Sequence, residues 1–132
     1  MRCMIVEDNI MLSEGLRFFL TGHAEIEVAM NGREAVAMFQ QGLVDQKPFD
    51  LVLLDIMMPE MDGQQALKLI RLAESHDWSP QRKKAVIIMT SALNSPENME
   101  EALWDGDCTD YLVKPVGRAE LMAMLHKYEL IS

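Results

Sequence analysis

The chain has 132 residues, of which 49% are hydrophobic and 25% charged, and its formal net charge is −9 at pH 7. This length and composition fit one soluble globular domain, and no apolar run approaches the roughly 20 residues of a membrane span or follows a signal-peptide pattern. The acidic charge argues against nucleic-acid binding, which needs clustered Lys and Arg. We expect a cytoplasmic protein in which Cys3 and Cys108 are reduced core thiols.

Short apolar segments alternate with amphipathic segments along the whole chain. The apolar segments predict strands over residues 2–6, 24–30, 51–55, 85–89 and 111–113. The amphipathic segments predict helices that begin after Asn9, at Asn31, at Gly63, at Ser95 and at Arg118, and the last should run to Leu130. Alternation of this kind is typical of a parallel sheet with helices on both faces. We therefore predict a single α/β domain over residues 1–132.

The chain is organised around the stretch from Leu51 to Asp55. Four aliphatic residues in a row indicate a strand buried on both faces, and Asp55 follows them directly. Such a strand delivers its last residue to the carboxyl edge of the sheet, where open α/β folds bind their ligands. A carboxylate beside so much apolar surface must be held by a cation, hydrogen-bonded or reactive.

Other strands also end on polar residues. Glu7 and Asp8 follow the first strand, Thr90 follows the fourth and Lys114 follows the fifth, so all should meet Asp55 at one edge. Three carboxylates raise each other's pKa unless a cation lies among them, and oxygen ligands favour Mg²⁺ or a similar hard ion. Acids, a metal, a lysine and a hydroxyl suit phosphoryl transfer, with Asp55 as the nucleophile that forms an acyl phosphate.

At these positions the sequence resembles the receiver domains of two-component response regulators, over essentially its whole length. Each matching segment is weak alone, but five in this order at strand ends make a strong match. The resemblance implies a flavodoxin-like (βα)5 fold with five parallel strands in the order 2-1-3-4-5. The matching segments are Val6-Glu7-Asp8-Asn9, Asn31-Gly32-Arg33-Glu34-Ala35, Asp50 through Gly63, Met89-Thr90-Ser91-Ala92 and Asp110-Tyr111-Leu112-Val113-Lys114-Pro115.

The resemblance also implies a phosphoryl-accepting site. Asp55 would take a phosphoryl group from a histidine kinase or a phosphotransfer protein. Mg²⁺ or Mn²⁺ would be held by Asp8, Asp55 and the backbone carbonyl of Met57, with Glu7 acting on the ion through water. The protein would be a stand-alone signalling switch, similar to chemotaxis regulators. It would not be an enzyme beyond catalysing its own phosphorylation and dephosphorylation.

A switch is implied at the fourth and fifth strands. Lys114, with a cis bond to Pro115, would pair with the phosphoryl group, Thr90 would swing to hydrogen-bond it, and Tyr111 would turn inward. A phosphoryl group that interacts better with one state shifts a pre-existing equilibrium toward that state. The surface of the fourth helix, fifth strand and fifth helix would then change for a downstream protein partner, and could also form a homodimer. Tyr111 as an ordinary edge-strand aromatic residue is the alternative.

Departures from the family pattern are few. Asp107 stands where a glycine usually ends the fourth helix, and aspartate tolerates the left-handed conformation better than most residues. Met57 and Ala92 are apolar, and their positions are similar to those that tune access of water to the phosphoryl group in the family, which predicts moderately slow self-dephosphorylation. Trp104 either is half exposed on the partner surface or packs sideways.

Three other functions compete with the switch. A receiver fold that serves as an interaction module without phosphorylation would typically lack one of the site residues, and here all are present. A haloacid-dehalogenase-like phosphatase requires a second aspartate two residues after the nucleophile, where Met57 stands. A flavodoxin-like cofactor binder needs a glycine- and hydroxyl-rich loop after the first strand, and Glu7-Asp8-Asn9 has the wrong charge for phosphate. Membrane binding is not expected.

Overall fold

A single parallel sheet forms the centre of the molecule. The computed structural model describes residues 1–56, 61–76, 83–91 and 107–132. The strands lie in the order β2-β1-β3-β4-β5, and each neighbouring pair is parallel, as the sequence predicted. Their bounds are β1 Arg2–Val6, β2 Glu25–Ala29, β3 Leu51–Asp55, β4 Val86–Ser91 and β5 Asp110–Val113.

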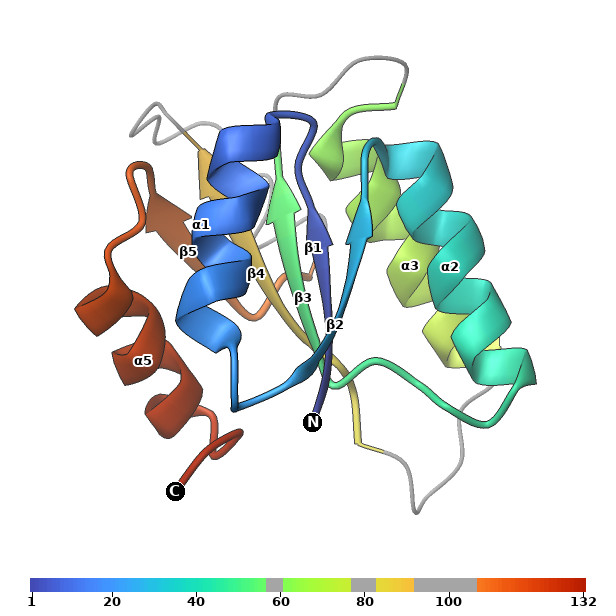
Figure 1. Cartoon of the computed structure of the whole chain (residues 1–132). Helices are drawn as coiled ribbons and strands as arrows, with labels where there is room; N and C mark the ends of the chain where they lie inside the picture. The colour runs from blue at the N-terminus through green and yellow to red at the C-terminus, as the bar shows by residue number, and fades with distance from the viewer. Residues whose placement is uncertain (57–60, 77–82, 92–106) are drawn as a thin grey trace.

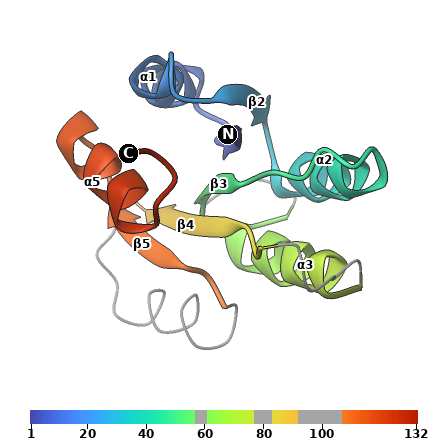
Figure 2. The ribbon, with the colours of Figure 1, turned by 90° about the horizontal axis from the view of Figure 1, so that it is seen from below.

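The described helices cover both faces of this sheet. Helices α1 and α5 lie on one face, and α2 and α3 lie on the other (Figures 1 and 2). The helix predicted to begin at Ser95 lies outside the described residues. None of the described helices is long and apolar enough to span a membrane. The helix bounds are α1 Ile10–Leu20, α2 Gly32–Val44, α3 Gly63–His76 and α5 Arg118–Lys127.

The central strand β3 joins the two layers of the core. All five of its residues are buried. Leu51 and Leu53 pack in the cluster under α1 and α5, whereas Val52 and Leu54 pack in the cluster under α2 and α3. Truncating a buried leucine typically costs about 2–5 kcal/mol, so this alternation holds the strand firmly on both sides. The residue at its carboxyl end, Asp55, is therefore presented from a rigid support.

Short polar side chains fix where the helices begin at the carboxyl edge. The Asn9 side-chain oxygen accepts a hydrogen bond from the Leu12 N–H at 3.1 Å, which confirms the predicted cap of α1. Asn31 caps α2 in the same way, and the Asp62 carboxylate accepts from the Gln65 N–H in the first turn of α3 at 2.9 Å. These caps satisfy N–H groups that have no partner inside the helix.

The chain departs from the sequence prediction mainly at its carboxyl end. Helix α5 ends at Lys127 and not at Leu130, and Glu129 has a φ of 60°. The Tyr128 hydroxyl donates a hydrogen bond to the Asp110 carboxylate, so the residue after the helix is turned toward β5. Asp107 has a φ of 62°, as expected for a residue at a position that favours glycine. Cys3 and Cys108 are both free and buried.

Candidate functional site

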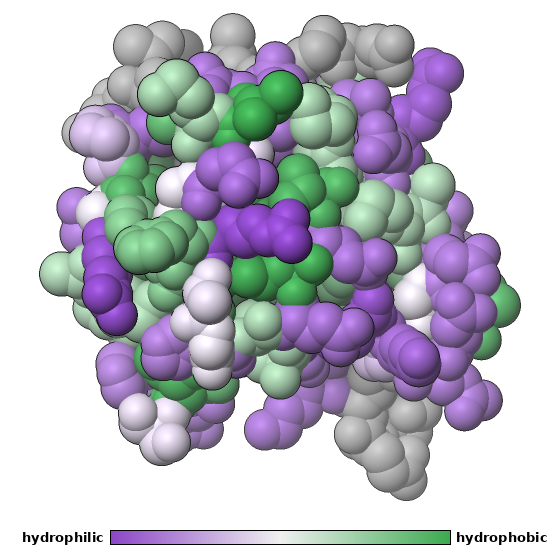
Figure 3. Space-filling view, viewed as in Figure 1, coloured by the Kyte–Doolittle hydropathy of each residue, from purple (hydrophilic) through white to green (hydrophobic). Residues whose placement is uncertain are grey.

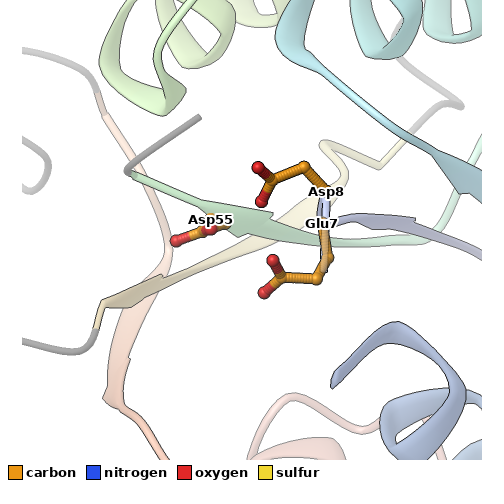
Figure 4. Close-up of side chains that lie close together, drawn as sticks. All are labelled: Glu7, Asp8 and Asp55. Carbon is orange, nitrogen blue, oxygen red and sulfur yellow. The ribbon is translucent and has the colours of Figure 1, made fainter. Parts of the chain in front are cut away.

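Three carboxylates meet at the carboxyl edge of the sheet. Glu7 and Asp8 follow β1, and Asp55 ends β3, which pairs with β1. One carboxylate oxygen from each of the three lies within 4.8 Å of the others. In Figure 4 the Glu7 and Asp8 side chains leave the end of β1 in opposite directions, and both carboxylates are turned toward Asp55. Glu7 and Asp55 are buried, whereas Asp8 is exposed to solvent.

Lys114 supplies a positive charge to this group from the end of β5. Its Nζ lies 2.6 Å from Glu7 Oε1 and 3.2 Å from Asp55 Oδ2. The Lys114 backbone N–H donates to the Ser91 carbonyl at 2.7 Å, and its bond to Pro115 is cis, as the sequence predicted. Burial would lower the pKa of Lys114, but the two carboxylates outweigh it and raise that pKa above its ordinary value. The lysine is therefore charged at neutral pH.

Glu7 is held by both of its carboxylate oxygens. Oε1 accepts from Lys114, and Oε2 accepts from the Asn9 N–H at 3.1 Å. Burial raises the pKa of Glu7, and the Asp55 charge adds to this; the hydrogen bonds from Lys114 and Asn9 oppose the rise without cancelling it. The sequence had assigned Glu7 only to a metal ion through water, so its direct pairing with Lys114 is a new finding.

The predicted switch residues lie on the two strands beside β3. Thr90 is opposite Asp55 in the register between β3 and β4, and its carbonyl accepts from the Ile56 N–H at 3.0 Å. Tyr111 pairs with Met89 in the register of β4 and β5. Its ring is buried, with 8% of the residue exposed, within the apolar cluster under α2 and α3.

Gly63 allows the backbone to pass close behind Asp55. A Cβ atom at this position would lie 2.2 Å from the Asp55 carbonyl oxygen and 2.7 Å from the Ile56 Cα. Its N–H donates to the Ile56 carbonyl at 2.9 Å. The sequence indicated Gly63 as part of the turn after the central strand and as a helix start, but did not predict how closely the backbone approaches Asp55 here.

Three residues singled out from the sequence lie outside the described residues. They are Met57, whose carbonyl was assigned to the metal, and Ala92 and Trp104. The predictions that rest on them, including slow self-dephosphorylation, remain predictions.

An apolar groove opens next to the polar site. It has a volume of about 140 Å³ and runs between Leu12 and Phe19 of α1 on one side and Pro115 and Val116 on the other, with Lys114 at its polar end. Met11, which also lines this groove, is 84% exposed, and Phe18, near the end of α1, is 73% exposed. In Figure 3, which shows the face on which α1 lies, apolar surface is interspersed with polar side chains.

Comparison with known proteins decides the family. The family model described as the response regulator receiver domain matches residues 3–126. The chain belongs to this family. In this receiver domain, three groups lie together: the buried aspartate at the end of β3, the acid pair after β1 and the lysine after β5.

Two comparisons with solved structures and one with a curated sequence extend this result. The receiver domain is 35% identical, over 91% of its length, to an uncharacterized transcriptional regulatory protein, YcbL of Bacillus subtilis, and covers 47% of that protein. It is 32% identical, with a TM-score of 0.79, to a chain in the complex of the Saccharomyces cerevisiae phosphotransfer protein Ypd1 with the receiver domain of Ssk1, covering 96% of this chain and 85% of that one. It is 28% identical, also with a TM-score of 0.79, to a chain in the CheX–CheY–BeF3–Mg²⁺ complex of Borrelia burgdorferi, covering 96% and 88%. The chain spans less than half the length of the curated relatives it matches first.

Proposed function

We propose that this receiver domain is a phosphorylation-dependent switch in which Asp55 accepts a phosphoryl group. The observation that carries the proposal is the position of the Asp55 carboxylate, 3.2 Å from Lys114 Nζ and beside the Glu7 and Asp8 carboxylates. An Asp55 oxygen attacks the phosphorus of a phosphohistidine, the P–O bond forms as the P–N bond breaks, and the nitrogen lone pair returns to the imidazole ring. The product is an aspartyl phosphate.

The residues at the site fit a hard divalent cation such as Mg²⁺ or Mn²⁺. Three carboxylates and one lysine leave a net charge of −2 (three negative charges and one positive) within a few ångströms, and all the candidate ligand atoms are oxygen. We assign Asp8 and Asp55 as direct ligands, together with the Met57 carbonyl, and Glu7 as a residue that acts on the ion through water. The cation, when bound, neutralises charge that develops on the transferred phosphoryl oxygens. Lys114 neutralises part of the same charge from the other side.

Thr90 and Tyr111 couple the formation of the aspartyl phosphate to a change of the protein surface. A phosphoryl group adds nearly two negative charges and strong acceptors at Asp55, and Thr90 lies on the neighbouring strand in register with it. We infer that Thr90 moves to donate a hydrogen bond to the phosphoryl group and favours the inward position of Tyr111. The surface around β5 and α5, with the helix predicted between residues 95 and 106, then differs between the two states. A downstream protein, or a second copy of the chain, would bind one state better than the other.

The phosphodonor is a histidine kinase or a phosphotransfer protein. Its histidine must reach Asp55, and the exposed apolar residue Met11 of α1 lines the groove that also contains Glu7, Thr90 and Lys114. Such a surface is typical of a protein contact. The protein would act in the cytoplasm as one domain over residues 1–132, without direct contact to nucleic acid or membrane, and would catalyse only its own phosphorylation and dephosphorylation. The alternative remains an interaction module that works without phosphorylation.

Incubation with acetyl phosphate and Mg²⁺ tests this proposal. We expect mass spectrometry to show the addition of one phosphoryl group to the wild type and to Asp62→Asn. The Asp55→Asn variant should take up none. Asp62 is a suitable control because it is an exposed acid at the same edge whose helix cap an asparagine can retain. A wild type that takes up no phosphoryl group, and that shows no Mg²⁺-dependent change with acetyl phosphate or beryllofluoride, would support the phosphorylation-independent module.

A further inference from the structure

Arg71 of α3 contacts several segments at the amino edge of the sheet, opposite the carboxyl edge that carries the phosphoryl-accepting site. Its Nε donates to the Asp107 carbonyl at 2.8 Å. One terminal nitrogen donates to the Ala85 carbonyl at 3.0 Å and to Glu74 Oε1 at 2.7 Å, and the other donates to Thr109 Oγ1 at 3.3 Å. A single guanidinium thus joins α3 to the residues that precede two strands.

These contacts fix the starting points of β4 and β5 relative to each other. Ala85 immediately precedes β4, and Thr109 immediately precedes β5. Thr109 also joins the two strands directly, since its N–H donates to the Ile87 carbonyl at 2.7 Å and its Oγ1 accepts from the Ile87 N–H at 2.9 Å. Figure 2, which looks at the sheet from this edge, shows α3 on the opposite side of β4 from α5.

The Arg71–Glu74 ion pair is largely buried, with 11% and 7% of the two side chains exposed. The second Glu74 oxygen accepts from the Ala85 N–H at 2.6 Å. A buried ion pair is weak evidence for stability, because desolvation offsets the attraction between the charges. The best-attested use of such groups is to specify register. Arg71 and Glu74 satisfy backbone groups of Ala85 from both sides, which suits that use.

We propose that Arg71 is a positioning residue that sets the register of β5 on β4 and thereby places Lys114 beside Asp55. Strand β5 has four residues and, within the described part of the chain, pairs only with β4. A slip of one residue would turn every side chain to the opposite face. Tyr111 would leave the core under α2 and α3, and Lys114 would leave the two carboxylates. The consequence for activity rests on the proposed function, whereas the consequence for register does not.

Hydrogen exchange of Arg71→Met tests the register directly. We expect the β5 amides of this variant to exchange at least about tenfold faster than in the wild type, with the amides of β1 and β3 unchanged. Arg2→Met is the matched control. Arg2 lies at the same edge of the sheet and donates hydrogen bonds to the Lys47 carbonyl and to Glu27. Its guanidinium lies 4.3 Å from the Phe49 ring centroid. None of these contacts involves β4 or β5. Unchanged β5 exchange in Arg71→Met, or an equal effect in Arg2→Met, overturns the proposal.

The rate of Asp55 phosphorylation by acetyl phosphate and Mg²⁺ tests the effect on Lys114. At a temperature where both variants are folded, Arg71→Met should be slower by about tenfold or more, since small displacements of positioning groups are costly, and Arg2→Met should stay within about twofold of the wild type. A normal rate despite faster β5 exchange also overturns the proposal. If the wild type is not phosphorylated, the proposed function fails, and the exchange comparison still decides the register.

Arg71→Lys serves if Arg71→Met does not fold. Lysine keeps a positive charge beside Glu74 but cannot donate to the Asp107, Ala85 and Thr109 groups together in one fixed geometry. The expected pattern is the same: faster exchange in β5 and slower phosphorylation than in the wild type. A Lys variant that matches the wild type in both measurements would show that only the charge is needed, against the proposal.

Discussion

At the scale of single residues, the site depends on how closely the backbone passes behind Asp55. We expect Gly63→Ala to lower the free energy of unfolding by about 1–3 kcal/mol, because the new methyl group would overlap backbone atoms that cannot move aside easily. Asp55 would be displaced with them, so its phosphorylation by acetyl phosphate should slow as well. Urea unfolding and the phosphorylation rate give the two readouts.

Gly15→Ala is the control for this substitution. Gly15 lies inside α1, and a Cβ atom there would meet nothing within 4 Å. Alanine in a helix interior is favoured over glycine by roughly 0.5–1 kcal/mol, so this variant should be more stable than the wild type. If both variants lose stability to the same extent, crowding behind Asp55 is not the cause.

The residues of the site were predictable because all of them lie at or directly after the carboxyl ends of strands of one parallel sheet. Once the strands are assigned, a parallel arrangement places four of these residues at one edge: Glu7, Asp55, Thr90 and Lys114. The partners within the site were not predictable. Glu7 binds Lys114, which lies 107 positions away in the chain. This pairing depends on the lengths of the two side chains and on the Asn9 N–H, which donates to the second Glu7 oxygen. Sequence spacing predicts neither.

At the scale of the elements, β5 is attached to α5 through Asp110. Its Oδ2 accepts from the Tyr128 hydroxyl and from Lys127 Nζ at 3.1 Å, while Oδ1 accepts from the Tyr111 N–H at 2.8 Å. This contact holds Tyr128, the residue after α5, against β5. The helical pattern in the sequence continues past Lys127, but Glu129 has a φ of 60° and the Leu130 N–H donates to the Leu125 carbonyl at 2.8 Å, so the chain leaves the helix here.

The Asp110 attachment should make part of the stability sensitive to acid. Burial raises the pKa of Asp110, but hydrogen bonds from Tyr128, the Tyr111 N–H and Lys127 outweigh it and leave that pKa below its ordinary value of 3.8. The folded state therefore binds its proton less readily than the unfolded state. The stabilisation is present above about pH 3.8 and is lost as the pH falls through the folded-state pKa.

We expect Asp110→Asn and Tyr128→Phe each to lower the free energy of unfolding by about 1 kcal/mol at pH 7, since each removes hydrogen bonds to a charged group. The difference from the wild type should shrink as urea unfolding is repeated at decreasing pH toward 2–3. Asp45→Asn is a control of equal charge change at an exposed helix end. A difference that stays constant across this pH range would contradict the role of the Asp110 charge.

At the scale of the whole molecule, the fold gathers negative charge at one point of an already acidic chain. The net charge is −9, and the three carboxylates and the lysine of the site contribute −2 of it. The sheet fixes these groups before any cation arrives, so self-repulsion at the site is part of the energy of the folded state. A cation that binds only the folded state relieves this repulsion and raises stability.

We expect Mg²⁺ at 100 times its dissociation constant to raise the free energy of unfolding by about 2.7 kcal/mol, and EDTA to reverse the gain. Urea unfolding in MgCl₂ is compared with NaCl at equal ionic strength, so that general screening is the same in both. Asp8→Asn should lose most of the gain, because it removes the solvent-facing carboxylate of the cluster. Asp62→Asn removes an equal charge from the same edge outside the cluster and should keep the gain. An equal response of both variants would mean that Mg²⁺ acts through overall charge and not through a site built by the ends of β1 and β3.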